Sequence, residues 1–361
     1  MLYNLPVRWT LILQTLCFIP PAQCLSSSQR GHEDQGSCRS RYQVKSPHSM
    51  GERNQTSVTE FILLGFSDHP QLQGLICGTV LLIYLISVLG NFVFLVLMCA
   101  NPQLHKPMYF FLSNLSIMDI CSTSLTLLKM LDSYLTQNYS ISFHACITQV
   151  YFFMYFSAIE YLLLTEMAYD RYVAICNPLR YSLIMNKSIC LLLASSSWVT
   201  AFLASFPVAN MLSQLSYCKS NVINHFFCDP SVLMKLSCSD THRVAMWIFV
   251  DGIVVGFIPF LLILTSYIFI ISSILRIRCT EGRHKAFSTC ASHLTSVILY
   301  CVSILCMYMK PTSMYSSARD KMVSLLYTAM VPTLNPIIYS LRNREIKNTF
   351  KKIKCKSKNS I

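Results

Sequence analysis

Seven apolar runs, each about 20 residues long or longer, constrain this chain more than any other feature of its sequence. A helix needs about 20 mostly apolar residues to cross the hydrocarbon core of a bilayer. In lipid every backbone N–H and C=O must also be satisfied within the chain, which favours helices. We therefore predict an all-α membrane protein, a seven-transmembrane helix bundle. The runs are 75–99, 108–128, 147–169, 189–209, 244–275, 286–309 and 322–341.

The composition agrees with lipid as the main solvent of this chain. Hydrophobic residues make up 53% and charged residues only 12%, whereas soluble domains average about 25% charged residues. The net charge of +13 does not indicate a nucleic-acid-binding domain, because over half of it lies in the tail 342–361, which has eight Lys or Arg and one acid. A basic tail beside a membrane span is expected to face anionic lipid.

Basic residues also predict the orientation of the bundle, because short cytoplasmic loops are rich in Lys and Arg. The loops after the first, third and fifth runs and the tail all fall on one side, which we interpret as cytoplasmic. The N-terminus is then outside and the C-terminus cytoplasmic, with 50–74 as an extracellular N-terminus and 75–341 as the bundle. The basic residues in these loops include Lys106, Arg171, Arg180, Lys187, Arg276, Arg278, Arg283 and Lys285.

The first 49 residues form an atypical N-terminal extension with two interpretations. A short apolar stretch at 9–20, followed by small residues, resembles a weak signal peptide. Alternatively, the extension lies upstream of a working start at Met50. We favour the second interpretation, because Met50 opens a segment that is complete in itself.

Acidic residues within the apolar runs are notable, because ionisable groups there are costly and are functional by default, and three of them are considered as candidates. Asp119 lies in the middle of the second run and Glu160 in the middle of the third. Two carboxylates that face a bundle interior would attract a cation, or one would stay protonated; a polar pair that only packs helices is the alternative. Asp251 lies in the outer half of the fifth run, where it meets a ligand or reaches hydrated loop atoms.

Two short motifs end the third and seventh runs. Asp170, Arg171 and Tyr172 end the third run, where Arg171 could also simply extend to the interface. The second motif runs from Asn335 through Pro336 to Tyr339. Pro336 removes a backbone donor and frees a carbonyl, and we expect Asn335 to bond the broken backbone.

The outer connections carry candidate sites of covalent modification. Sequons for N-glycosylation begin at Asn54 and, less favourably placed, at Asn138. Four cysteines also lie at this face, and four thiols in an oxidising compartment favour two disulfides, for which sequence allows three connectivities. A metal site with His225 is the alternative. The four cysteines are Cys146, Cys218, Cys228 and Cys238.

Several long strings resemble those of odorant (olfactory) receptors in the rhodopsin-like G-protein-coupled receptor superfamily. They are TEFILLGF at 59–66, PMYFFLSNLS at 107–116, MAYDRYVAIC at 167–176, Ser266-Tyr267, KAFSTCASHL at 285–294 and PTLNPIIY at 332–339. The resemblance covers the chain from about Met50 to its end. It departs where the family has Phe-Tyr-Gly and this chain has Leu299-Tyr300-Cys301, which puts the packing of the sixth helix in doubt.

The resemblance implies a function and a set of roles. It implies a receptor, not an enzyme, that binds a small, volatile, mostly apolar odorant and activates a heterotrimeric stimulatory G protein to raise cyclic AMP, in the plasma membrane of olfactory cilia. It pairs Cys146 with Cys228 and Cys218 with Cys238. It implies no cofactor except a possible sodium ion at Asp119, Glu160 and Asn335. The residues of G-protein coupling and switching would be Asp170, Arg171, Tyr172, Tyr267, Asn335, Pro336 and Tyr339, with Tyr300 as an aromatic switch below the ligand.

Helical spacing groups the candidate ligand contacts into faces of single helices. Which faces point inward is taken from the resemblance, which also implicates Phe153 and Thr328; ordinary packing of helices is the alternative. A mostly apolar pocket with a few hydroxyls suits a small volatile molecule. The predicted lining is Phe153, Met154, Ser157 and Ala158, then Asp251 and Val255, then Tyr300, Ser303, Ile304 and Met307, and Thr328.

Three other classes of membrane protein fit the sequence less well. A transporter would be expected to show paired repeats, and we find none at a fixed period. A membrane enzyme would need clustered ligands or a nucleophile with its base. A non-olfactory receptor for amines would normally carry an acid on the ligand face of the third helix, where this chain has Phe153 and Met154.

Overall fold

The computed structural model describes residues 58–66, 70–308 and 317–342. Three sequence predictions lie outside these residues: the extension 1–49, the sequon at Asn54 and the basic tail beyond Arg342. The side chain of Met307 is also outside the described part of the chain.

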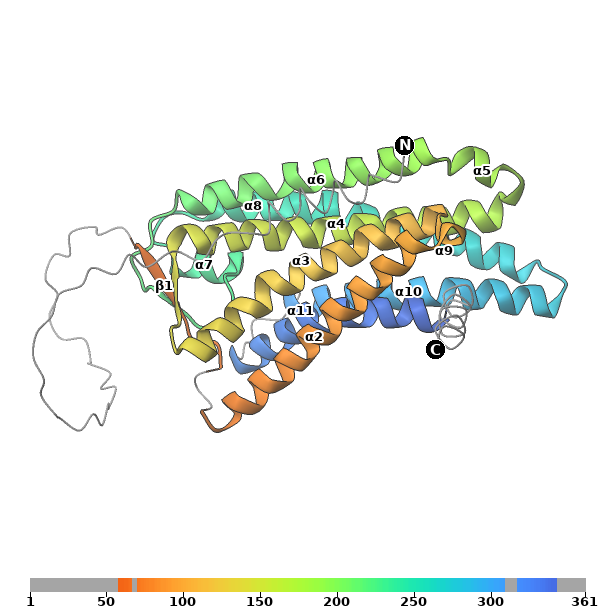
Figure 1. Cartoon of the computed structure of the whole chain (residues 1–361). Helices are drawn as coiled ribbons and strands as arrows, with labels where there is room; N and C mark the ends of the chain where they lie inside the picture. The colour runs from red at the N-terminus through yellow and green to blue at the C-terminus, as the bar shows by residue number, and fades with distance from the viewer. Residues whose placement is uncertain (1–57, 67–69, 309–316, 343–361) are drawn as a thin grey trace, which may run out of the picture. The chain divides into compact units, whose positions relative to one another are not determined.

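Seven helices are long and apolar enough to cross a membrane, which confirms the predicted bundle. Six of them are single continuous helices, and the fifth is built from three consecutive segments (Figure 1). Each helix begins before its predicted run, because residues ahead of the apolar stretch continue the backbone hydrogen bonding of the helix. The helices are α2 (Pro70–Ala100), α3 (Pro107–Thr136), α4 (Phe143–Cys176), α6 (Lys187–Ser213), α8 (His242–Asp251) with η3 (Gly252–Phe257) and α9 (Ile258–Leu275), α10 (Thr280–Tyr308) and α11 (Ser317–Arg342).

Local sequence explains where several helices begin. The Ser142 hydroxyl accepts a hydrogen bond from the backbone N–H of Ala145 and caps α4. The side chain of Asn186 caps α6 in the same way, by accepting from the N–H of Ile189. Proline occupies the first turn of α3, where its missing donor costs nothing. The helix α6 continues through Pro207.

The fifth helix changes its winding in the middle. The segment η3 is a π-helix, between the α-helical segments α8 and α9. Pro259 lies in the first turn of α9, directly after the π segment. Single π turns inside α-helices occur frequently at functional sites, and this one lies in the part of the fifth helix where Asp251 and Val255 were predicted to face a ligand.

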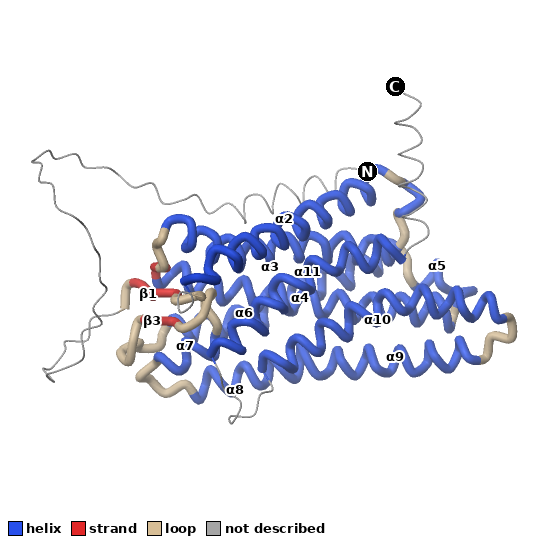
Figure 2. Tube along the Cα trace, turned by 90° about the horizontal axis from the view of Figure 1, so that it is seen from below, coloured by secondary structure: helices blue, strands red, loops and turns tan. Residues whose placement is uncertain are grey.

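A three-stranded sheet joins the connections at one end of the bundle. Its central strand β1 (Glu60–Leu63) pairs antiparallel with β2 (Ser140–Ser142) and parallel with β3 (Val222–Ile223). Figure 2 shows β1 and β3 beside the short helix α7 (Pro230–Leu236). We call this the disulfide end. The sheet is not predictable from the sequence, because strands of four, three and two residues carry too short an alternation to recognise.

The opposite end of the bundle, which we call the Arg171 end, carries short helical turns. They are η1 (Pro102–Leu104), η2 (Pro178–Arg180) and α5 (Tyr181–Ile184). In Figure 1, α5 and the turn between α9 and α10 lie at this end, far from β1. The two ends are therefore built from different structures on the same seven helices.

The helix α4 lies at the centre of the bundle. It packs against α3, α6, α9 and α10, whereas α2 packs against α3 and α11. The apolar stretch of α4 is 56% buried and that of α2 only 28%. Exposed large apolar side chains on α2, α6 and α9 are expected where helices face lipid. Residues on α4 therefore have the best access to the other helices, and most of the site depends on them.

Candidate functional site

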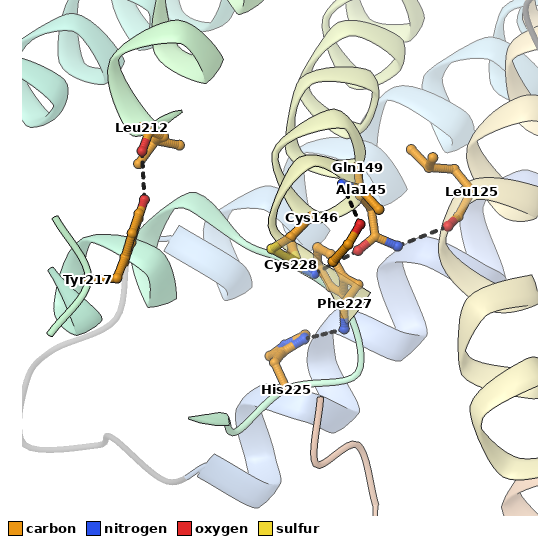
Figure 3. The surroundings of a disulfide bond; sticks show 10 residues. Leu125, Ala145, Cys146, Gln149, Leu212, Tyr217, His225, Phe227 and Cys228 are labelled. Atoms are coloured by element: carbon orange, nitrogen blue, oxygen red, sulfur yellow. Dashed lines mark hydrogen bonds between the residues drawn. A yellow bond between two sulfur atoms is a disulfide. The ribbon is translucent and has the colours of Figure 1, made fainter. Parts of the chain in front are cut away.

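Two disulfides fix the long connection between α6 and α8 at the disulfide end. Cys146 in the first turn of α4 is bonded to Cys228, and Cys218 is bonded to Cys238. One turn after Cys146, the Gln149 side chain accepts from the backbone N–H of Cys228 at 2.9 Å and donates to the carbonyl oxygen of Leu125 at 3.1 Å (Figure 3). The pairing is the one that the family resemblance implies. Gln149 adds a second link beside the first disulfide.

His225 is part of an aromatic cluster in the same connection. Its ring stacks on Phe226 at 4.7 Å and meets Phe227 edge to face at 4.5 Å. Its Nε2 lies 3.2 Å from the hydroxyl of Ser324 on α11. Because all four nearby cysteines are in disulfides, none offers a thiolate ligand beside His225.

Below this connection, tyrosines join α10 and α11 to α4. The Tyr300 hydroxyl donates to the backbone oxygen of Ser157 at 2.7 Å, and the Tyr327 hydroxyl donates to the Ser157 Oγ at 3.2 Å. Tyr161, one turn along α4, stacks on Tyr300 with ring centroids 5.0 Å apart. The structure thus brings Ser157 and Tyr300 together. Tyr327 was missed by the sequence analysis, although its hydroxyl lies in an apolar run.

Phe153 connects this tyrosine cluster to the loop above. Its ring lies 4.9 Å from Phe227 and 6.4 Å from Tyr327. Thr328 is buried on α11, and its hydroxyl donates to the backbone oxygen of Ser324 in its own helix. These side chains, which we call the aromatic floor, separate the loop from the middle of the bundle.

The rest of the predicted lining is only partly drawn together. Met154 packs against the hydrophobic cluster under the loop, and Val255 is buried. The Ser303 hydroxyl donates to the backbone oxygen of Leu299 at 2.7 Å, so Ser303 can offer a ligand only an acceptor. Ala158 is buried on α4 and Ile304 is half-buried on α10.

Cys301, where the family has glycine, fits beside α4. Its sulfur lies 3.7 Å from the hydroxyl of Tyr161, within the distance of a weak hydrogen bond to sulfur. The departure from the family pattern therefore adds a contact between α10 and α4.

The two acids predicted to meet do lie in the same buried region. Asp119 is 1% and Glu160 5% exposed. The Asn335 side chain donates to both carboxylate oxygens of Asp119 at 3.2 Å. The Glu160 Oε1 is buried without a hydrogen-bond partner among the described residues. This buried group therefore consists of two carboxyl groups and one amide, and one oxygen of Glu160 is left unsatisfied.

The break at Pro336 is repaired by a residue that the sequence analysis did not consider. Because Pro336 has no N–H, the carbonyl of Pro332 lacks its helical partner. Asn91 on α2 donates to that carbonyl at 3.0 Å. A Cβ at Gly90 would come within 3.3 Å of the Pro336 ring, so glycine lets the two helices approach. The prediction that Asn335 bonds the broken backbone is wrong: Asn335 bonds Asp119 instead.

At the Arg171 end, Asp170 and Arg171 form a loosely bonded group. Asp170 accepts from the hydroxyl of Tyr181 on α5 at 2.8 Å. The Arg171 guanidinium is 3.6 Å from the other Asp170 oxygen, which is too long for a hydrogen bond. Burial, and then the Asp170 carboxylate, raise the pKa of the Tyr181 hydroxyl, so Tyr181 remains a donor to Asp170. The ring of Tyr172 lies 5.9 Å from Phe269 on α9.

A buried histidine links three helices near the same end. The Tyr267 hydroxyl lies 2.7 Å from the Nδ1 of His293, and the His293 Nε2 lies 3.0 Å from the backbone oxygen of Leu164. Because Leu164 accepts, Nε2 carries the proton and Nδ1 accepts from Tyr267. Tyr267 was predicted as a switch residue, but its partner was not. An ionisable side chain in an apolar run is the signal that would have identified His293.

Glu166 is a further buried acid within an apolar run, and it was not singled out from the sequence. It lies on α4 and accepts from the Ser197 hydroxyl on α6 at 2.5 Å. Its second oxygen is buried without a partner among the described residues. The rule that selected Asp119 and Glu160 applies equally to Glu166, so the signal was present in the sequence.

A small cavity lies apart from the predicted ligand contacts, between β1, α2, α3 and the loop. Its free volume is about 30 Å³, and its lining includes Phe66, Cys77, Ser133, Tyr139 and Phe226. Ligand pockets for small molecules are usually about 300–1,000 Å³, so this cavity has room for one or two waters. A water there would give the buried Ser133 hydroxyl a partner.

Comparisons with known proteins agree with this structure. The sequence model of the olfactory receptor family matches residues 80–357. Olfactory receptor 8U9 of Mus musculus is 46% identical over 304 residues, which cover 84% of this chain and 97% of the relative. Olfactory receptor 5I1 of Homo sapiens is 47% identical over 302 residues, covering 84% and 96%. The chain therefore belongs to the olfactory receptor family, and it is a multi-pass receptor of the plasma membrane, not an enzyme.

Proposed function

We propose that this receptor binds a small, mostly apolar odorant inside the disulfide-end half of the bundle and activates a stimulatory G protein to raise cyclic AMP. The observation that carries this proposal is the double connection between α10 and α4. Tyr300 joins α10 to Ser157 in the middle of the bundle, and His293 joins α10 to Leu164 nearer the Arg171 end. A ligand at the first connection can change the position of α10 at the second.

The ligand site would lie between the aromatic floor and the loop that the disulfides hold. Phe153, Phe227 and Tyr327 supply apolar rings, and Ser157 supplies polar atoms in the middle of the bundle. A ligand shifts the receptor toward its active form only by its greater affinity for that form. The odorant therefore has to bind better when α10 has moved away from α4.

We place the disulfide end outside the cell and the Arg171 end in the cytoplasm. Disulfides form in oxidising compartments, and basic loops concentrate on the cytoplasmic side. Release of the Tyr267–His293–Leu164 connection would open the bundle beside Arg171, which could then contact the G protein. The incompletely bonded Asp170 and Arg171 favour such a rearrangement, because few hydrogen bonds have to break.

A sodium ion fits the buried acids as a resident ion of the inactive form. Asp119 and Glu160 would supply carboxylate oxygens, and the unsatisfied Glu160 Oε1 is the atom that lacks a partner. The ion would offset the negative charge that both acids bring into the bundle. Asn335 would keep the Asp119 carboxylate oriented through its two hydrogen bonds.

A screen of volatile molecules in cells that report cyclic AMP tests the proposed function. Cells that express the receptor should respond to at least one odorant, whereas cells without it should not. The response should disappear in cells that lack the stimulatory G-protein α subunit. A response that persists there would contradict the proposed coupling.

A further inference from the structure

Asp251 is an acid on the inward face of the fifth helix. Val244, Ile248, Asp251 and Val255 follow at helical spacing and share one face. Val244 and Val255 are buried, and Ile248 packs against the hydrophobic cluster under the loop. The face that carries Asp251 is therefore turned toward the bundle and is otherwise apolar.

The carboxylate of Asp251 has an unsatisfied oxygen. Its Oδ1 is buried and has no hydrogen-bond partner within the described part of the chain. Glu160 and Glu166 also have one such oxygen each, but Glu166 accepts from Ser197 through its other oxygen and Glu160 lies beside Asp119 and Asn335, whereas Asp251 is the acid on the apolar face of the fifth helix. A buried charge without a partner is strongly unfavourable. A partner for Asp251 would remove this cost.

Asp251 lies at a junction within the fifth helix. Asp251 is the last residue of α8, and the π-helix η3 begins at the next residue. The segment α8 packs against α6, and η3 packs against α4. Asp251 therefore lies at the point where the fifth helix passes from its contact with α6 to its contact with α4, the helix that carries most of the predicted ligand contacts.

The surroundings of Asp251 favour an organic cation over a metal ion. Calcium takes six to eight oxygen ligands, and the described residues contain no group of three His, Cys, Asp or Glu that could hold a metal ion. Apolar neighbours such as Ile248 and Val255 suit the hydrocarbon part of a ligand. An ammonium group would donate hydrogen bonds to the carboxylate and would place a positive charge beside its negative charge.

We propose that Asp251 binds the ammonium group of a small amine odorant and makes the receptor selective for amines over neutral molecules of the same shape. This inference rests on the proposed odorant-receptor function and names the class of ligand. The ammonium N–H would donate a hydrogen bond to a carboxylate oxygen of Asp251. The carbon skeleton of the amine would pack against the apolar face of the fifth helix.

The test uses primary amines of five to eight carbons, each paired with the alcohol of the same skeleton. Two measurements are made on the full-length receptor: thermal stabilisation of the purified protein and cyclic AMP in cells, normalised to surface expression. Amines should act at concentrations roughly tenfold to a hundredfold lower than the paired alcohols, as expected for a hydrogen bond to a charged group.

Three variants separate binding at Asp251 from general damage. Asp251→Asn keeps the size of the side chain and should remove the preference for amines, whereas Asp251→Glu should keep most of it. Asp132→Asn is the matched control, because Asp132 is an exposed acid on α3 that pairs with Lys129. This control should behave like the wild type with both classes of ligand.

The outcomes distinguish this inference from the proposed function. Amines that stabilise the wild type but not Asp251→Asn support the inference, even if cyclic AMP does not rise, in which case the proposed coupling is wrong. Alcohols that activate the receptor as well as amines do, or an unchanged amine preference in Asp251→Asn, overturn the inference and leave the receptor function intact. Failure of every amine to stabilise the wild type also overturns it.

Discussion

The two ends of the bundle are held by different kinds of interaction. At the disulfide end, two covalent bonds, a three-stranded sheet and the Gln149 hydrogen bonds fix the connections over the helices. At the Arg171 end, the connections are short helical turns, and Asp170 is held by one tyrosine hydroxyl. The first end is built to keep its shape, and the second can change its shape by breaking a few hydrogen bonds.

This difference fits a receptor that receives a ligand at one end and responds at the other. Within the described residues, buried polar atoms without a hydrogen-bond partner lie near the Arg171 end in Asp170, Arg171 and Glu166. Each such atom raises the free energy of the present arrangement, so an alternative arrangement that satisfies them costs less to reach. The helix α10 connects the two ends through Tyr300 and His293.

The largest expected effect follows from removing the charge at the Arg171 end. Arg171→Ala should abolish odorant-evoked cyclic AMP while leaving surface expression near the wild-type level, because the Arg171 Nε already lacks a hydrogen-bond partner in the described structure. Cyclic AMP and surface staining are measured on the same cells. Full signalling at matched surface levels would contradict the role of Arg171.

The next effect tests the rigidity of the disulfide end. Cys146→Ser or Cys228→Ser should retain the receptor inside the cell, since loss of a native disulfide typically costs about 2–5 kcal/mol. Cys218→Ser should be milder, because that bond closes a separation of 20 residues against 82. Surface staining of tagged receptors gives the ranking. Equal surface levels in all three variants and the wild type would show that these bonds do not stabilise this end.

A smaller effect is expected from loosening the Arg171 end by one hydrogen bond. Tyr181→Phe removes the donor to Asp170 and should favour the rearranged form by about 0.5–1.5 kcal/mol. Basal cyclic AMP should therefore rise about twofold to tenfold. Tyr169→Phe on α4 is a control, because Tyr169 is 40% exposed. Unchanged basal signalling in Tyr181→Phe would show that this bond does not restrain the receptor.

The smallest effects concern single contacts of the ligand site. Ser303→Ala should change odorant potency by less than about threefold, because its hydroxyl already bonds Leu299. Ser157→Ala should do more, since Ser157 Oγ accepts from Tyr327 and its loss frees that tyrosine. Dose–response curves normalised to surface expression compare the two. A larger effect for Ser303 would mean that it contacts the odorant directly.

Much of the fold could be predicted from the sequence, because its main signal is physical and strong. A run of 20 apolar residues has few structures open to it in lipid, and all seven runs became helices. The sheet could not be predicted, since β1 pairs with segments about 80 and 160 positions away, and strands of two to four residues show no usable period. The π segment depends on packing that no local pattern records.

In the candidate site, some residues are likewise recognisable from their local sequence, whereas others are recognisable only from the contacts that the fold creates. Asp119 and Glu160 were found because a carboxylate in an apolar run is conspicuous, whereas Asn91 was missed because an amide there is ordinary. Only the fold brings Asn91 to the carbonyl that Pro336 leaves free. Likewise, spacing placed Tyr300 and Ser303 on one face of a helix, but the partner of each hydroxyl depended on the neighbouring backbone.

The separation between α10 and α4 at the Arg171 end tests the central claim most directly. Two spin labels, introduced as non-natural residues at Leu179 in η2, which follows α4, and at Glu281 in the first turn of α10, lie on exposed positions. Their distance is measured in the purified receptor with and without an activating odorant and the stimulatory G protein. We predict a population with a longer distance in the presence of both. An unchanged distance distribution, in a sample that activates the G protein, would contradict the account.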